Sequence, residues 1–172
     1  MRRKPKKATK AKPGPLRTAI WLDPAGVMGE GPEAEAERLV KWYEEELGAK
    51  LDVHTPRNIG EIKPGTGLVL FDFGGMMAGN GLAEDNSRAL VRWAEDNPNS
   101  LVVVVSDFTY DQAFRHAIED HIGEAAPWNF QKEDGARHTT PLHNVVVQEW
   151  GEEFVPKWFR QAHGCKPSWR GK

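Results

Sequence analysis

Two uninterrupted apolar runs constrain this chain more than any other feature of its sequence. One extends from Gly67 to Phe71 and the other from Leu101 to Val105, and a segment of helical periodicity follows each. Such short runs, without alternating polar residues, are typical of strands buried on both faces of a parallel sheet. Parallel neighbours need a crossover connection, which is usually a helix. The two runs therefore predict an α/β protein.

The rest of the chain predicts three more strands, with helices between the strands. The additional strands are expected at residues 18–22, 51–54 and 145–147. Apolar periodicity and helix-end signals predict helices at residues 32–47, 82–97, 110–122 and 154–163. Residues 55–66 should form a loop or one irregular turn. Right-handed crossovers then favour a doubly wound, mostly parallel five-stranded sheet of the flavodoxin-like order 2-1-3-4-5, with helices on both faces.

The periodicity also predicts which side chains of the helices face the sheet. In the second helix the expected inward stripe is Leu82, Asn86, Leu90, Trp93 and Ala94. In the third helix it is Tyr110, Phe114, Ala117, Ile118 and His121.

Charge divides the chain into an acidic body and two basic segments. The N-terminal basic segment (residues 1–16) holds seven Lys and Arg residues, the C-terminal basic segment (residues 164–172) holds three, and neither holds an acid. Residues 17–163 carry 13 basic and 25 acidic residues, a net charge of −12, and are expected to form a single domain.

The N-terminal basic segment has three possible roles. Its Pro, Lys and Gly residues bury little, so a disordered, solvated arm is the simplest interpretation. Its seven cations also suit the phosphates of a nucleic acid or an acidic protein surface. It can instead fold back on the acidic body. The segment has no aromatic residue for base stacking, so binding through it alone should be non-specific.

Other bulk features bear on the cellular compartment. Cys165 is the single cysteine, which excludes an internal disulfide and fits a reducing environment. No run approaches the ~18 apolar residues of a membrane span. The basic start Met1-Arg2-Arg3-Lys4 is not followed by the apolar stretch of a signal peptide. We therefore expect a cytoplasmic protein with no membrane contact.

The predicted sheet order indicates where a ligand would bind. In doubly wound sheets, ligands bind beyond the carboxyl ends of the strands where the winding direction reverses, which here is between strands 18–22 and 68–71. Both following loops are rich in glycine, which allows close backbone approach to a small anionic ligand. The candidate ligand-binding residues are Gly26, Gly29, Gly74, Gly75, Asn80 and Asp107. Neither loop has the spacing of a known phosphate-binding motif, so tight turns are the alternative.

Acidic residues stand at the ends of the same strands. Asp23, Asp72 and Asp107 lie at or just past three strand ends, and Glu149 lies near a fourth. Carboxylates that converge on one edge repel each other unless a cation lies between them. Mg²⁺ prefers one or two carboxylates together with waters and phosphate oxygens. Asp23 and Asp72 are therefore the candidate metal ligands, and capping of the following turns is the alternative role of these aspartates.

The middle of the chain resembles a known family. Leu68-Val69-Leu70-Phe71-Asp72, Met76-Met77, Asn80-Gly81 and Val102 to Ser106 resemble the centre of bacterial response-regulator receiver domains. The resemblance covers residues 68–106 and implies a flavodoxin-like fold with Asp72 as phosphoacceptor, Ser106 as switch hydroxyl and Asp23 as metal ligand. The chain departs from the family in having Leu22-Asp23 where an acidic pair is usual. It also has Ala78 where proline is usual, and Gln148-Glu149 where a lysine is expected.

Three classes of function remain open from the sequence. The first is a ligand- or Mg²⁺-binding regulatory domain. The second is a small hydrolase or transferase acting on a nucleotide-like or phosphate-bearing substrate, with Asp72, Asp23 and Ser106 as catalytic candidates. The third is a non-enzymatic interaction protein that uses residues 1–16 to contact nucleic acid or a partner protein. A serine-hydrolase triad is disfavoured, because no serine lies on a glycine-flanked turn.

Overall fold

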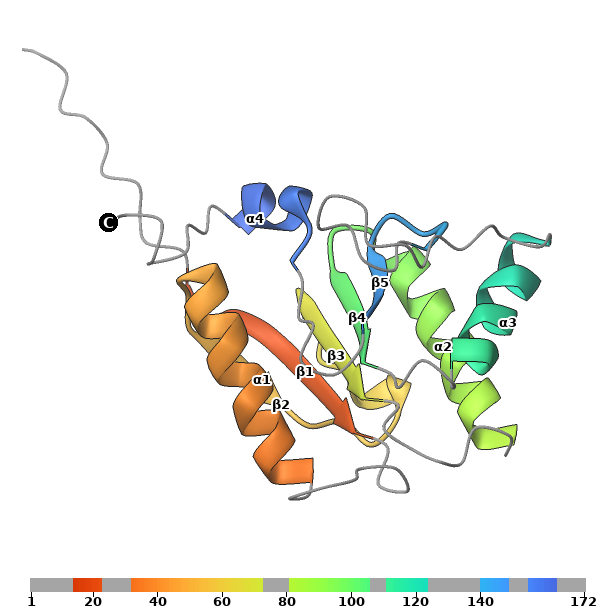
Figure 1. Cartoon of the computed structure of the whole chain (residues 1–172), viewed down its shortest axis with the longest axis horizontal. Coiled ribbons are helices and arrows are strands. Elements are labelled where there is room, and N and C mark those ends of the chain that lie inside the picture. The colour runs from red at the N-terminus through yellow and green to blue at the C-terminus, as the bar shows by residue number, and fades with distance from the viewer. Residues whose placement is uncertain are drawn as a thin grey trace, which may run out of the picture.

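The structure is a computed structural model that describes residues 14–22, 32–72, 81–105, 111–123, 140–148 and 155–163 (Figure 1). Five strands form one parallel sheet in the order β2-β1-β3-β4-β5, which confirms the predicted fold class and strand order. The strands are β1 (Leu16–Leu22), β2 (Leu51–His54), β3 (Leu68–Asp72), β4 (Leu101–Val105) and β5 (Val145–Gln148).

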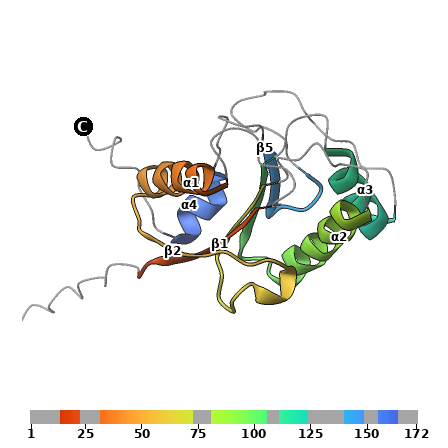
Figure 2. The same cartoon turned by 90° about the horizontal axis from the view of Figure 1, so that it is seen from below.

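Helices cover both faces of this sheet, as Figure 2 shows. They are α1 (Pro32–Leu47), α2 (Gly81–Asp96), α3 (Asp111–Ile122) and α4 (Lys157–His163). The connection between β2 and β3 contains only a 3-10 turn, η1 (Ile59–Glu61), as the irregular composition of that segment predicts. No helix within the described ranges is long and apolar enough to cross a membrane.

One face of the sheet is covered by α1 and α4. Leu39, Tyr43 and Leu47 of α1 and Phe159 of α4 are fully buried there. The strands supply alternate residues to the same cluster: Ile20, Leu68, Leu70, Leu101, Val103, Val105 and Val146. Burial of each large apolar side chain stabilises the fold by about 1.5–3 kcal/mol, so this layer is a main source of stability.

The opposite face is covered by α2, which α3 contacts in turn. Leu90, Val91 and Ala94 of α2 pack on the other set of strand residues, which includes Ala19, Val69, Phe71, Val102 and Val104. Trp21 and Phe71 from neighbouring strands meet there, with ring centroids 4.8 Å apart. β3 and β4 are therefore covered on both faces and have a neighbouring strand on each side, as their unbroken apolar runs predict.

The buried stripes of α2 and α3 match the expected ones in part: Leu90, Ala94, Ala117 and Ile118 are buried as predicted. The side chains of Leu82, Tyr110 and Phe114 lie outside the described part of the chain. Ser87 and Val91 of α2 are fully buried, whereas Trp93 is only partly buried at the margin of the cluster. Their spacing of three and four residues places Ser87, Leu90, Val91 and Ala94 on one helix side. In α3, His121 does not enter the core, because its Nε2 lies 2.9 Å from a carboxylate oxygen of Glu95 on α2.

The ends of several elements have clear physical causes. Gly48 and Gly123 follow α1 and α3 with φ of 62° and 76°, a conformation that favours glycine at a helix end. The sequence predicts that the last helix starts at residue 154. This prediction is wrong for residues 155 and 156, which precede the helix. The carbonyl of Pro156 accepts hydrogen bonds from the Phe159 and Arg160 N–H groups at 3.1 and 3.3 Å, so the helix starts after this proline.

Candidate functional site

Four strands end at the same level of the sheet. Leu22 pairs with Asp72, Asp72 with Val105, and Val105 with Gln148, so β1, β3, β4 and β5 finish in one row. The predicted side-by-side, parallel arrangement of segments 18–22 and 68–71 is therefore confirmed. The residues that directly follow these four strand ends in the sequence are Asp23, Phe73, Ser106 and Glu149, and three of the four are polar.

The winding direction reverses between β1 and β3. After β1 the chain passes to α1 on one face, and after β3 it passes to α2 on the other face (Figure 2). The two connections thus diverge from adjacent strands. In open α/β sheets this divergence marks the position where ligands bind.

Only one of the predicted site residues falls within the described part of the chain. Asp72 is the last residue of β3, and its backbone belongs to the sheet. The other candidates lie outside the described residues: Asp23, Gly26, Gly29, Gly74, Gly75, Asn80, Ser106 and Asp107. In the described ranges, no group of three or more His, Cys, Asp or Glu residues is arranged to hold a metal ion. The metal, phosphoacceptor and ligand roles of these residues stay predictions.

The opposite, N-terminal edge of the sheet is held by side-chain hydrogen bonds. Asn144, which precedes β5, is buried and its amide donates to the carbonyls of Ala94, Asn97 and Ser100 at 2.8, 3.1 and 3.0 Å. Ser100, which precedes β4, donates from its hydroxyl to the Thr66 carbonyl at 2.7 Å. Three strand entrances are therefore linked to one another and to the end of α2.

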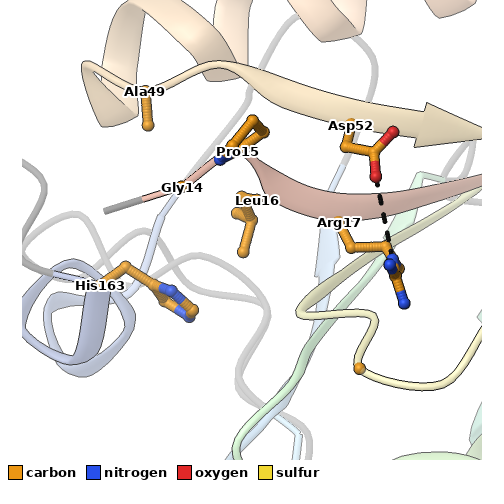
Figure 3. A pocket seen from close by; sticks show the side chains of 8 residues that line it. Gly14, Pro15, Leu16, Arg17, Ala49, Asp52 and His163 are labelled. Atoms are coloured by element: carbon orange, nitrogen blue, oxygen red, sulfur yellow. Dashed lines mark ion pairs between the residues drawn. The ribbon is translucent and has the colours of Figure 1, made fainter. Parts of the chain in front are cut away.

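The same N-terminal edge contains a hollow of about 410 Å³ beside the start of β1 (Figure 3). Its lining residues are Gly14, Pro15, Leu16, Arg17, Ala49, Asp52, Gly65 and His163. Arg17 Nε lies 3.8 Å from a carboxylate oxygen of Asp52, and both side chains are largely exposed. A surface ion pair of this kind contributes little to stability.

His163 is the titratable group of this hollow that is most removed from water. Its ring contacts the ring of Phe159, with centroids 4.3 Å apart. Burial lowers the pKa of His163, which favours the neutral form of the imidazole in this hollow.

Sequence reasoning missed this hollow because its residues come from four separate segments. Arg17 and Asp52 are neighbours only through the β1–β2 register, in which Arg17 pairs with Asp52. The sequence carries one signal for this contact, namely opposite charges at equivalent positions of two adjacent strands. This signal can be used only once the register of the two strands is known.

Comparisons with protein-family models, with curated proteins and with solved structures found no match to this chain.

Proposed function

We propose that this protein binds a small phosphate-bearing ligand, together with Mg²⁺, beyond the carboxyl ends of β1 and β3. The observation that carries the proposal is the pairing of Leu22 with Asp72 at the winding reversal of the sheet. It puts the Asp72 position beside the strand end that leads directly into Asp23. The rule for open α/β sheets assigns ligand binding to this position.

The residue types near this position match the chemistry of such a ligand. Asp23 and Asp72 would supply the carboxylates that Mg²⁺ prefers, and the remaining coordination would come from waters and phosphate oxygens. Backbone N–H groups would contact the phosphate, because glycine allows close approach and both loops lead into helix N-termini. The residues proposed for this contact are Gly26, Gly29, Gly74 and Gly75, with Asn80, Ser106 and Asp107 as polar neighbours.

The polar residues at the two edges of the sheet have different roles, and this difference supports the same assignment. Asn144 and Ser100 use their side chains to join strand entrances at the N-terminal edge. The polar residues Asp23, Ser106 and Glu149 follow strand ends at the carboxyl edge. The resemblance to receiver domains would make Asp72 a phosphoacceptor. We propose binding rather than phosphotransfer, because Gln148-Glu149 stand where that family has its lysine.

Thermal unfolding with defined ligands tests this proposal. The melting temperature would be measured with Mg²⁺ alone, with inorganic phosphate alone, and with Mg²⁺ plus inorganic phosphate. A ligand at one hundred times its Kd stabilises a protein by about 2.7 kcal/mol. For a domain of this size that gain corresponds to a rise of about 5–10 °C in melting temperature. We expect Mg²⁺ plus inorganic phosphate to give the largest rise.

Three variants make the assignment specific. Asp72→Asn and Asp23→Asn should abolish the rise caused by Mg²⁺. Asp96→Asn is the matched control, because Asp96 is an exposed aspartate at the far end of α2. The proposal fails if none of the ligands stabilises the wild-type protein, or if the Asp72→Asn protein responds as the wild type does.

A further inference from the structure

An apolar groove of about 420 Å³ lies between β2, which is a border strand of the sheet, and α1, which runs along the same side of the sheet (Figure 1). Its apolar lining consists of Ile20 of β1, Val53 of β2, and Ala36 and Val40 of α1. Ile20 is almost fully buried, whereas Val53 is the exposed large apolar side chain of the described residues. A single exposed valine needs no explanation, but here it forms one wall of a groove that reaches down to the core.

The backbone of β2 disfavours another strand as the occupant of this groove. The Leu16 N–H donates to the Lys50 carbonyl at 2.9 Å, a pattern that in a parallel pair turns the backbone groups of Leu51 and Val53 outward. The outward Leu51 N–H already donates to Glu44 Oε1 at 3.0 Å. Because β2 has only four residues, few backbone groups remain for a further strand. A helix satisfies its own backbone groups and can lay an apolar face into such a groove.

Two charged residues of α1 line the groove without a partner in the described part of the chain. They are Glu37 and Lys41, which lie one helical turn apart. Residues with this spacing can pair with each other on a helix, yet neither forms an ion pair with an opposite charge among the described residues. Glu44, which also lines the groove, is in contrast paired with Lys50 at 2.9 Å. The groove thus presents one unpaired negative and one unpaired positive charge.

We propose that two copies of the chain associate through this groove, with their α1 helices antiparallel across a two-fold axis. An axis that passes α1 midway between Glu37 and Lys41 sets Glu37 of each copy opposite Lys41 of the other. Ala36 and Val40 then lie next to the axis in both copies, where apolar surface is buried. A two-fold interface requires a surface that is complementary to itself, and this pattern of charges meets that requirement. A purely basic or purely acidic partner would match only one of the two charges.

The size of the contact indicates how strong the association is. α1 has 16 residues and is therefore about 24 Å long. A contact made by one helix and one groove falls at the low end of the range of specific interfaces, which bury about 1,200–2,000 Å². We therefore expect a weak, reversible dimer. This association is independent of the ligand site proposed above, which lies beyond the carboxyl ends of β1 and β3.

Sedimentation velocity of the full-length protein tests the proposal. Concentrations from about 10 µM to about 1 mM cover the dissociation constants of a weak dimer. A salt concentration of about 0.15 M screens the long-range repulsion between two acidic bodies. The weight-average sedimentation coefficient should rise with concentration from the value of a monomer toward that of a dimer.

Charge reversals identify the surface that associates. Glu37→Lys and Lys41→Glu each place like charges opposite each other, and each should weaken association about tenfold or more. An equimolar mixture of these two variants should associate again, because each copy then supplies the charge that the other lacks. The double variant Glu37→Lys/Lys41→Glu should associate as the wild type does. The matched controls are Arg92→Glu and Asp96→Lys, which reverse exposed charges one turn apart on α2 and should leave association unchanged.

Val53→Ser tests the apolar part of the interface. It should also weaken association about tenfold or more, because a side chain that packs against the second copy is lost. The melting temperature of the dilute protein should change little, since Val53 is exposed in the single chain.

Several outcomes would overturn the proposal. A wild-type protein that stays monomeric over the whole concentration range has no such interface. Equal losses in the α1 and α2 variants would show that only net charge matters. Failure of both the mixture and the double variant to associate would show that Glu37 and Lys41 do not face each other. If, in addition, Lys41→Glu behaves as the wild type, a basic segment occupies the groove instead. Asp72→Asn should associate as the wild type does, so this test and the test of the Mg²⁺ site fail independently.

Discussion

Arg160 of α4 and Glu46 of α1 join the two helices that cover one face of the sheet. The Arg160 guanidinium donates to the Glu46 backbone carbonyl at 2.9 Å and pairs with the Glu46 carboxylate. The two side chains are only 16% and 18% exposed. The pair Arg88–Asp120 between α2 and α3 has a separation of 3.1 Å but exposures of 40% and 61%. These two arginine–carboxylate pairs both join helices, and they differ chiefly in burial.

This difference in burial predicts that removing each arginine lowers the free energy of unfolding by a different amount. Arg160→Gln removes one donor from the Glu46 carboxylate and from the Glu46 carbonyl in a poorly hydrated place, and should lower the free energy of unfolding by about 2–3 kcal/mol. Arg88→Gln should cost less than about 1 kcal/mol, because water replaces the lost partner. Urea unfolding of both variants measures the difference. Equal losses would mean that burial does not decide the strength of these pairs.

Asn144 should be among the most sensitive polar positions of the fold. Asn144→Ala removes the donor shared by the carbonyls of Ala94, Asn97 and Ser100, and should cost about 2–4 kcal/mol. Asn144→Asp should cost more, since a carboxylate would face these carbonyl oxygens. The control is Asn58→Ala, which removes an exposed cap bond to the Gly60 N–H at 2.9 Å and should cost about 1 kcal/mol. Chemical denaturation ranks the three variants, and a milder effect at residue 144 than at residue 58 would contradict this account.

Gly67→Ala should destabilise the corner where Leu16 and His163 meet. The new Cβ would be 2.7 Å from Leu16 Cδ1, so the leucine must move. Overpacking of this kind costs about 1 kcal/mol or slightly more. Leu16→Ala should remove most of the extra cost of the glycine substitution in a double-mutant cycle. Gly14→Ala, with no atom within 4 Å of the new Cβ, should be nearly neutral. A cycle without coupling would show that this contact is not tight.

Stability should decrease as the pH falls through the range of histidine titration. Burial and the neighbouring charge of Lys63 lower the pKa of His54, and burial lowers the pKa of His163. The Lys63 N–H also donates to His54 Nε2 at 3.1 Å, which requires that nitrogen to be unprotonated. The unfolded chain therefore binds protons more strongly than the folded protein. Stability is full above the unfolded pKa of about 6.5 and is lost as the pH falls toward the folded values.

Urea unfolding at pH 7.5 and pH 5.5 measures this loss. A protein with His54→Gln and His163→Gln should show a smaller decrease between the two pH values than the wild type, because the groups that take up protons on unfolding are gone. His116→Gln is the control, since His116 is exposed on α3. If the double variant keeps the full decrease, the pH dependence has another origin.

The sheet could be predicted from the sequence because its signals are local. The unbroken runs at β3 and β4 identify central strands, and glycines at positions 48 and 123 mark helix ends. The inward side of α2 was predicted less well. Trp93 is apolar enough to suggest burial, but tertiary packing selects Ser87 and Val91 instead. Helical periodicity alone does not choose between two overlapping stripes of similar hydrophobicity.

The candidate site could be located from the sequence only as a position. The strand and helix patterns of the sequence predict the order of the strands, and that order predicts where the winding reverses. The pairing of Leu22 with Asp72 confirms this position. The hollow near Arg17 and His163 could not be predicted. It depends on how β1, β2 and α4 meet, and no short sequence pattern records such contacts between distant segments.

The shortness of β2 has a consequence for how this protein behaves at high concentration. β2 forms one border of the sheet, has only four residues, and carries Asp52 in its middle. A long apolar border strand recruits strands of other molecules, whereas a short, charged one offers few hydrogen bonds and repels like charges. Val53, at 38%, is the exposed large apolar side chain of the described residues. We therefore expect the aspartate beside it to disfavour pairing of this border with strands of other molecules.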